Sequence, residues 1–201
     1  MKRRFCFTLV EILVVTALVA LLGVIGFAGY GYAMGAARRS ATESLIKQIE
    51  AALENFKIKK GYYPSSSSYA VIGLALNSSN EITSVSFGGT SWANTSDEFK
   101  TFIKPLDQEK LKKSISGNNL VDSWGGNIYY RYPGLVNAAG FDLIAPGPDS
   151  EFGTKDYKGS TPLTGNVKDK GVESSSEETV KNNYLYNREW ACDDIANFMD
   201  K

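Results

Sequence analysis

The sequence predicts an α+β fold, in which a long N-terminal α-helix with an apolar first half packs on a small antiparallel β-sheet domain that ends in a C-terminal loop region. Three observations predict this fold. Residues 12–37 carry no charged side chain, residues 38–60 repeat apolar side chains every three or four positions, and residues 122–154 have the alternation of a β-hairpin. A chain of 201 residues is long enough for one modest domain with an appendage.

The apolar segment 12–37 is long enough, as a helix, to cross a lipid bilayer. At 1.5 Å per residue it would extend about 39 Å, whereas the hydrocarbon core is about 30 Å thick. Lys2, Arg3 and Arg4 precede it. Because positive flanks stay in the cytoplasm, we expect the rest of the chain to be exported. Glu11 needs an explanation, since a carboxylate in hydrocarbon costs about 2–3 kcal/mol.

Three interpretations of this N-terminus compete. A secretory signal peptide has a shorter apolar core than this one, although the stretch GYGYAMGAA offers small residues for a cleavage site. A plain single-pass anchor explains the length and the flanking charges, but it leaves Glu11 without a role beyond hydration at the level of the lipid headgroups. The third interpretation gives Glu11 a partner and depends on the residues around it.

The stretch FTLVE at residues 7–11 resembles the N-terminal signal of type IV pilins and of the pseudopilins of type II secretion. The resemblance implies that residues 1–6 are a leader peptide, which a prepilin peptidase removes by cutting between Cys6 and Phe7. Phe7 would then be N-methylated. Members of this family normally have Gly immediately before the cut, whereas this chain has Cys6.

In this family, the acid at the position of Glu11 neutralises the new amine of a neighbouring subunit. Opposite charges attract strongly at low dielectric, and a single register of stacked helices satisfies both. The resemblance therefore implies that residues 7–37 form a transmembrane and polymerisation segment and that Glu11 sets the register of assembly by pairing with Phe7. Residues 38–201 would form a periplasmic domain.

Residues 38–60 are predicted to extend the helix with a single apolar face, which would pack on that domain. Three lysines near the end suit the C-terminus of a helix, where the helix dipole favours cations. Gly61 and Pro64 then stop the helix. The apolar positions are Ala41, Leu45, Ile46, Ile49, Ala52, Leu53 and Phe56.

A helix and a β-hairpin are predicted in the domain. Residues 97–111 form the helix, which Pro105 interrupts. NIYYRY at residues 127–132 is an alternating, aromatic-rich strand, PGLVNAAG is a turn, and FDLIAPG is the returning strand. Trp124, just before the first strand, is predicted to close one end of the core.

The stretch that begins DSWGG and continues through FDL to the loop APGPD also resembles the major pseudopilin of type II secretion. This resemblance implies a structural calcium site in that loop. Asp149 falls at the loop position, Asp193 and Asp194 fall near an acidic pair of the family, and the carbonyls of Ile144 and Ala145 are further candidate ligands. Oxygen ligands of this kind suit Ca²⁺. The alternative is an acidic loop that is simply solvated.

A polar insert at residues 155–183 is predicted to be a flexible or surface loop, because it contains few apolar residues. Family members are usually much shorter here. After the insert, Trp190 is predicted to be a core anchor, and Cys192 to be a small buried residue and not a reactive thiol.

Composition excludes several classes of function. The chain has no His, which removes catalytic Ser–His–Asp and Cys–His arrangements and the usual zinc ligand sets. Lys and Arg number 22 and so do Asp and Glu, without a basic patch for nucleic acid. We therefore do not expect an enzyme or a nucleic-acid-binding protein.

The resemblance implies a structural subunit, similar to the major pseudopilin, of a type II secretion pseudopilus. Such a subunit is a single-pass inner-membrane protein that polymerises into a periplasmic fibre and pushes folded proteins across the outer membrane. The implied partners are copies of itself, minor pseudopilins, the prepilin peptidase and the inner-membrane secretion platform. The alternatives are a type IV pilin subunit for adhesion, twitching or DNA uptake, and a non-polymerising, membrane-anchored periplasmic binding module.

Overall fold

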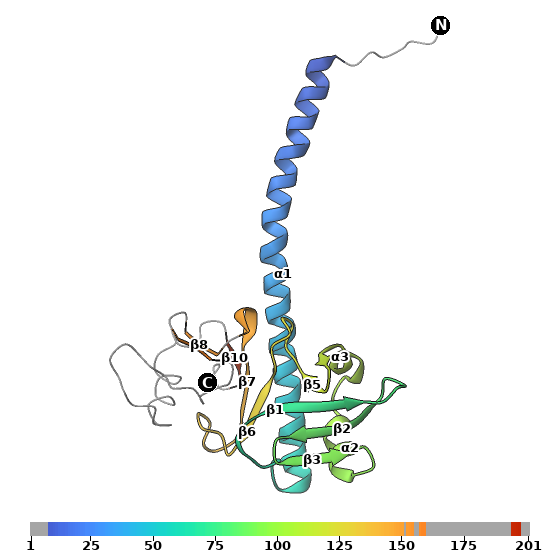
Figure 1. The fold of residues 1–201 in the computed structure, drawn as a ribbon, viewed down its shortest axis with the longest axis vertical. Helices are drawn as coiled ribbons and strands as arrows, with labels where there is room; N and C mark the ends of the chain where they lie inside the picture. The colour runs from blue at the N-terminus through green and yellow to red at the C-terminus, as the bar shows by residue number, and fades with distance from the viewer. Residues whose placement is uncertain (1–7, 151, 155–156, 160–193, 198–201) are drawn as a thin grey trace, which may run out of the picture. The chain divides into compact units, whose positions relative to one another are not determined.

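A computed structural model of the chain describes residues 8–150, 152–154, 157–159 and 194–197. The chain divides into two compact units, Met1–Arg38 and Arg39–Lys201. Helix α1, Leu9–Lys60, supplies the described part of unit 1 and the first helix of unit 2 (Figure 1). The predicted α+β class is confirmed, because unit 2 combines this helix with an antiparallel sheet.

The part of α1 within unit 2 has the predicted apolar stripe, with one exchange. The buried side chains are Leu45, Ile46, Ile49, Ala52, Leu53 and Phe56, whereas Ala41 is exposed and its neighbour Thr42 is fully buried. Thr42 is buried because its hydroxyl has hydrogen-bond partners in the domain. The helix ends as predicted, where Gly61, at φ 85°, donates its N–H to the Lys57 carbonyl at 2.7 Å.

The sheet of unit 2 is arranged around β1, Ser66–Leu76, and every described strand pair is antiparallel. The strand order is β10-β7-β6-β1-β2-β3, with β5 also pairing β1 and β4 pairing β5. The first half of β1 pairs with β6 and the second half with β2, so one strand joins two parts of the sheet. The other strands are β2 Ile82–Phe87, β3 Thr90–Ala93, β4 Ile115–Ser116, β5 Asn119–Leu120, β6 Tyr129–Tyr132, β7 Asp142–Ala145 and β10 Ile195–Ala196.

Two short helices replace the single interrupted helix that the sequence predicts. Helix α2, Asp97–Ile103, starts at Ser96, whose Oγ accepts the Phe99 N–H at 3.1 Å. Helix α3, Gln108–Lys113, starts at Asp107, whose carboxylate accepts the Lys110 N–H at 3.2 Å. The break at Pro105 is therefore confirmed, and each piece has its own N-cap.

The predicted β-hairpin is confirmed as β6 and β7, with Tyr130 opposite Leu143. Its first strand is shorter than predicted, because Asn127 instead forms an isolated bridge with Val121 and Ile128 donates its N–H to the Leu120 carbonyl. All four residues of β7 are buried. At the end of this region, β8 Phe152–Thr154 pairs with β9 Tyr157–Gly159, so the first residues of the predicted insert include a strand.

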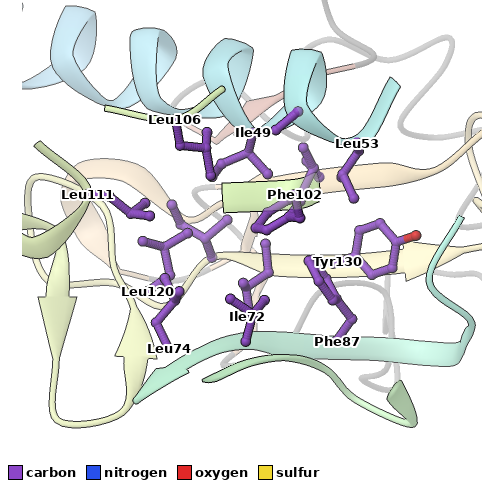
Figure 2. Close-up of a cluster of buried hydrophobic side chains, with 14 of the residues drawn as sticks. Ile49, Leu53, Ile72, Leu74, Phe87, Phe102, Leu106, Leu111, Leu120 and Tyr130 are labelled. Carbon is purple, nitrogen blue, oxygen red and sulfur yellow. The ribbon is translucent and has the colours of Figure 1, made fainter. Parts of the chain in front are cut away.

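The core lies between α1 and the sheet (Figure 2). Ile49 and Leu53 of α1 meet Phe102 of α2, with Ile72 of β1 on the sheet side. Trp124 is half-buried and packs against this cluster, in keeping with its predicted place at the core boundary. Trp190, Cys192 and most of the insert 155–183 lie outside the described residues.

Candidate functional site

The start of α1 is built around Glu11. Thr8 lies immediately before the helix and donates both its backbone N–H and its hydroxyl to Glu11 Oε2, at 2.8 and 2.9 Å. The Glu11 N–H returns a hydrogen bond to Thr8 Oγ1 at 3.2 Å. This reciprocal Thr-x-x-Glu arrangement is a capping box, which satisfies backbone donors at a helix N-terminus. Cys6 and Phe7, the predicted cleavage site, lie outside the described residues.

The capping role of Thr8 and Glu11 was missed in the sequence, although the signal was present. A Thr followed three residues later by Glu, just before an apolar run, is the usual signature of a helix start. The capping box therefore partly explains why an acidic residue lies at the start of an apolar helix. It also leaves the Glu11 side chain exposed, where a cation from outside the chain can approach it.

Large apolar side chains are exposed along the described part of unit 1. Leu9 is 80% exposed and Leu22 is 67% exposed, and Tyr32, farther along, is 84% exposed. Thr16 donates its hydroxyl to the Leu13 carbonyl at 2.9 Å, so this polar side chain is satisfied within its own helix. Among the described residues, none of the helices combines the length and the hydropathy that crossing a membrane requires.

The predicted calcium ligands fall on three elements of unit 2. Ile144 and Ala145 lie in β7, where β6 and β10 pair with Ile144 from either side. Asp149 ends the 3-10 turn η1, Gly147–Asp149, and is partly exposed. Asp194 is fully buried.

Strand pairing brings Asp194 to the loop that contains Asp149. Ile195 pairs with Ala145, the last residue of β7, so Asp194 directly precedes the residue paired with the end of that strand. Asn197 fixes β10 on β7, because its side chain accepts the Leu143 N–H at 2.9 Å. Asp193 lies outside the described residues, and within the described residues there is no group of three or more acidic or Cys side chains that could hold a metal ion.

A buried carboxylate that the sequence reasoning missed, Asp122, fastens the same loop. Its Oδ1 accepts the N–H groups of Trp124 and Gly126 at 2.9 and 2.8 Å, and its Oδ2 accepts the Gly147 N–H at 3.0 Å. Burial raises the pKa of Asp122, and these backbone hydrogen bonds oppose the rise. The quoted stretch DSWGG contained the signal, because an Asp before Gly-rich backbone often accepts its N–H groups.

A second buried carboxylate, Asp142, holds the turn between β6 and β7. Its Oδ2 accepts the Tyr69 hydroxyl at 2.7 Å and the N–H groups of Leu135 and Val136 at 2.6 and 2.9 Å, while Oδ1 accepts the Asn137 N–H at 2.8 Å. Asp122 and Asp142 therefore use their oxygens to bind backbone donors. This arrangement makes them structural anchors, unlike a metal ligand, whose lone pairs face the ion.

Comparison with known proteins adds no relative: no family model, curated protein or solved structure matches this chain.

Proposed function

We propose that this chain is a structural subunit of a type II secretion pseudopilus, similar to the major pseudopilin, and that it works mechanically and not as an enzyme. Its N-terminal segment would hold it in the inner membrane, with residues 38–201 in the periplasm. Copies would then assemble through this segment into a fibre that pushes folded proteins across the outer membrane. The prepilin peptidase, minor pseudopilins and the inner-membrane secretion platform are the partners that this proposal requires.

The exposed apolar side chains at the start of α1 carry the proposal. Each large side chain that passes from water into lipid or against a neighbouring helix contributes about 1.5–3 kcal/mol. A helix that is apolar on all sides is typically covered by lipid or by other helices. Glu11, held at its start by Thr8, is exposed and would supply the charge that pairs with the Phe7 amine of the next copy.

The test begins with the mass of protein isolated from its native membrane. We expect the chain to begin at N-methylated Phe7 and to be recovered in sedimentable fibres. Glu11→Gln is the decisive variant, because Gln still completes a capping box but carries no charge. We expect it to be processed normally and to give at least about tenfold less fibre, since an amine would be left unpaired.

Glu43→Gln is the matched control, because Glu43 is another partly exposed carboxylate of α1, paired with Arg39 at 2.9 Å. It should assemble like the unchanged protein. Normal fibres from Glu11→Gln would contradict the role of the charge in assembly. A chain that still begins at Met1 would instead support the membrane-anchored binding module, and fibres that serve adhesion without secretion would support a type IV pilin.

Calcium binding is the second part of the proposal, with Asp149, Asp193, Asp194 and the carbonyls of Ile144 and Ala145 as ligands. It is supported by the register of β7 and β10, which brings the buried Asp194 to the loop. Carboxylate and carbonyl oxygens are the ligands that this hard cation takes, and the bound ion would offset the buried charge.

Chelation tests the calcium site in the full chain held in detergent. A ligand bound only by the folded state stabilises it by about 2.7 kcal/mol at a hundred times its dissociation constant. We therefore expect a chelator to lower the melting temperature and Ca²⁺, but not Mg²⁺, to restore it. Asp194→Asn should abolish the response, whereas Asp107→Asn, which alters an exposed N-cap, should keep it. An unchanged melting curve would count against the metal.

A further inference from the structure

A chain of hydrogen bonds joins α1 to the loop 146–149. Thr42 of α1, which is fully buried, accepts the Ser123 N–H at 3.1 Å and donates its hydroxyl to Ser123 Oγ at 3.1 Å. Asp122, the residue before Ser123, accepts the Gly147 N–H at 3.0 Å. Two elements that are far apart in the sequence are thus connected through two adjacent residues of one turn.

The turn between these contacts is tightly closed. Asp122 binds two N–H groups of its own turn through Oδ1, those of Trp124 and Gly126. A Cβ added at Gly126 would lie 2.3 Å from Pro146 Cγ, so the backbone of the turn packs directly on the loop. Because Asp122 is 4% exposed, losing one of its donors is costly, and these contacts hold the turn and the loop together.

We propose that the chain Thr42–Ser123–Asp122–Gly147 is a coupling device, which transmits a displacement of the loop 146–149 to α1 at Thr42. Groups in one hydrogen-bond network respond to each other's changes, whereas distant groups without shared partners respond independently. Thr42 stands three residues after Arg39, the first residue of unit 2. Whatever binds or moves the loop therefore changes the stability of the first turns of α1 in this unit.

Two substitutions address the two ends of the device. Gly147 has φ 74°, a conformation that side chains disfavour, so Gly147→Ala displaces the loop without removing a side-chain contact. Thr42→Val keeps the shape of the buried side chain but removes the hydroxyl that contacts Ser123. Hydrogen exchange of the amides in residues 39–46, measured on the full chain in detergent, reports on the helix end of the device.

We expect Gly147→Ala to speed exchange in residues 39–46 about fivefold in the unchanged background and by less than about twofold in the Thr42→Val background. Asp97→Asn, which alters an exposed ion pair of the same unit, is the control background, and there the fivefold effect should persist. If Thr42→Val unfolds the domain, Ser123→Ala weakens the link more mildly, because it removes one of the two hydrogen bonds to Thr42 and keeps the one from the backbone N–H.

The coupling is contradicted if Gly147→Ala leaves exchange in residues 39–46 unchanged, or if its effect is the same with and without the Thr42 hydroxyl. Neither result depends on fibre assembly, because both are measured on the dispersed chain, and a chelator present throughout makes them independent of calcium. The outcome therefore tests this device separately from the proposed function.

Discussion

Helix α1 has two stretches rich in apolar side chains, residues 9–38 in unit 1 and residues 39–60 in unit 2. Among the side chains that the structure describes, only the second stretch has buried ones. Leu13 and Leu18 are 60% and 54% exposed, whereas Ile49 and Leu53 are 1% and 0% exposed. The difference follows from pattern. The first stretch is apolar on all sides, so one small domain cannot cover it, while the second confines its apolar side chains to a stripe that one sheet can cover. The second stretch therefore stabilises the domain, whereas the described large side chains of the first stretch remain exposed.

Matched leucine substitutions should give the largest difference between the two stretches. Leu53→Ala removes a fully buried side chain from the core and should lower the free energy of unfolding by about 2–5 kcal/mol. Leu18→Ala alters a side chain that is already half exposed and should change it by less than about 0.5 kcal/mol. Urea unfolding of the full chain in detergent, followed by tryptophan fluorescence, measures both, because Trp92 stacks on Phe56 in this core.

If the two leucine substitutions lowered the free energy of unfolding equally, the domain would also depend on the first stretch, and the contrast between the two stretches would be wrong. For the stability of assembled fibres, we expect the first stretch to matter more than the second. If the first stretch is covered by neighbouring copies, Leu18→Ala should weaken fibres of the assembled protein while leaving the dispersed chain stable.

Two carboxylates, Glu11 and Asp142, show the same difference between an exposed and a buried position. Glu11 is exposed and accepts two donors from Thr8, a residue of its own turn. Asp142 is fully buried and accepts four donors, from Tyr69 and three successive backbone N–H groups. The carboxylate of Glu11 stays exposed, whereas that of Asp142 is used entirely inside the domain.

In the dispersed chain, Asp142→Asn should therefore lower the free energy of unfolding by more than Glu11→Gln does. Asn offers one acceptor oxygen and an NH₂ group, so at least one buried donor would lose its partner, at about 1–3 kcal/mol for each. Glu11→Gln should change the free energy of unfolding by less than about 0.5 kcal/mol, because Gln can still close the capping box. The same urea unfolding measures both. A large cost for Glu11→Gln before any assembly would show that the box itself stabilises the chain.

Local patterns were enough to predict the helices and the β6–β7 hairpin of the domain, but they did not predict β1, β2 and β3. The stripe from Leu45 to Phe56 has the period of a helix, and the end at Gly61 was readable because glycine reaches a positive φ without strain. The hairpin of β6 and β7 was readable from alternation and a turn-rich gap. Each of these signals lies within about a dozen residues of the structure that it specifies.

The contacts that fasten the loops could not be predicted in the same way, because their partners are far apart in the sequence. Asp122 meets Gly147 25 residues away and Tyr69 meets Asp142 73 residues away, and nothing in either neighbourhood specifies the other. Periodicity predicts Ala41 and not Thr42 on the buried face, because it ranks apolar side chains first, whereas a hydroxyl is buried only where a hydrogen-bond partner is available. The capping box of Thr8 and Glu11, by contrast, is specified by residues only three positions apart, so it could be predicted from the sequence.

The smallest effect is expected at the C-terminal end of α1, where Lys60 pairs with Asp97 and lies 3.7 Å from Glu98. The hydrogen bond from Lys60 lowers the pKa of Asp97 below its ordinary value of 3.8. The folded state then binds fewer protons than the unfolded state in acid, so this stabilisation is present above the unfolded pKa and is lost as the pH falls through the folded one. Because Asp97 is 78% exposed, the effect is small and salt should reduce it further.

Asp97→Asn should slightly lower the melting temperature at pH 7 and at low salt, and the difference from the unchanged chain should vanish near pH 2. A difference that grows as the pH falls would show that the charge of Asp97 is not the source of the stabilisation.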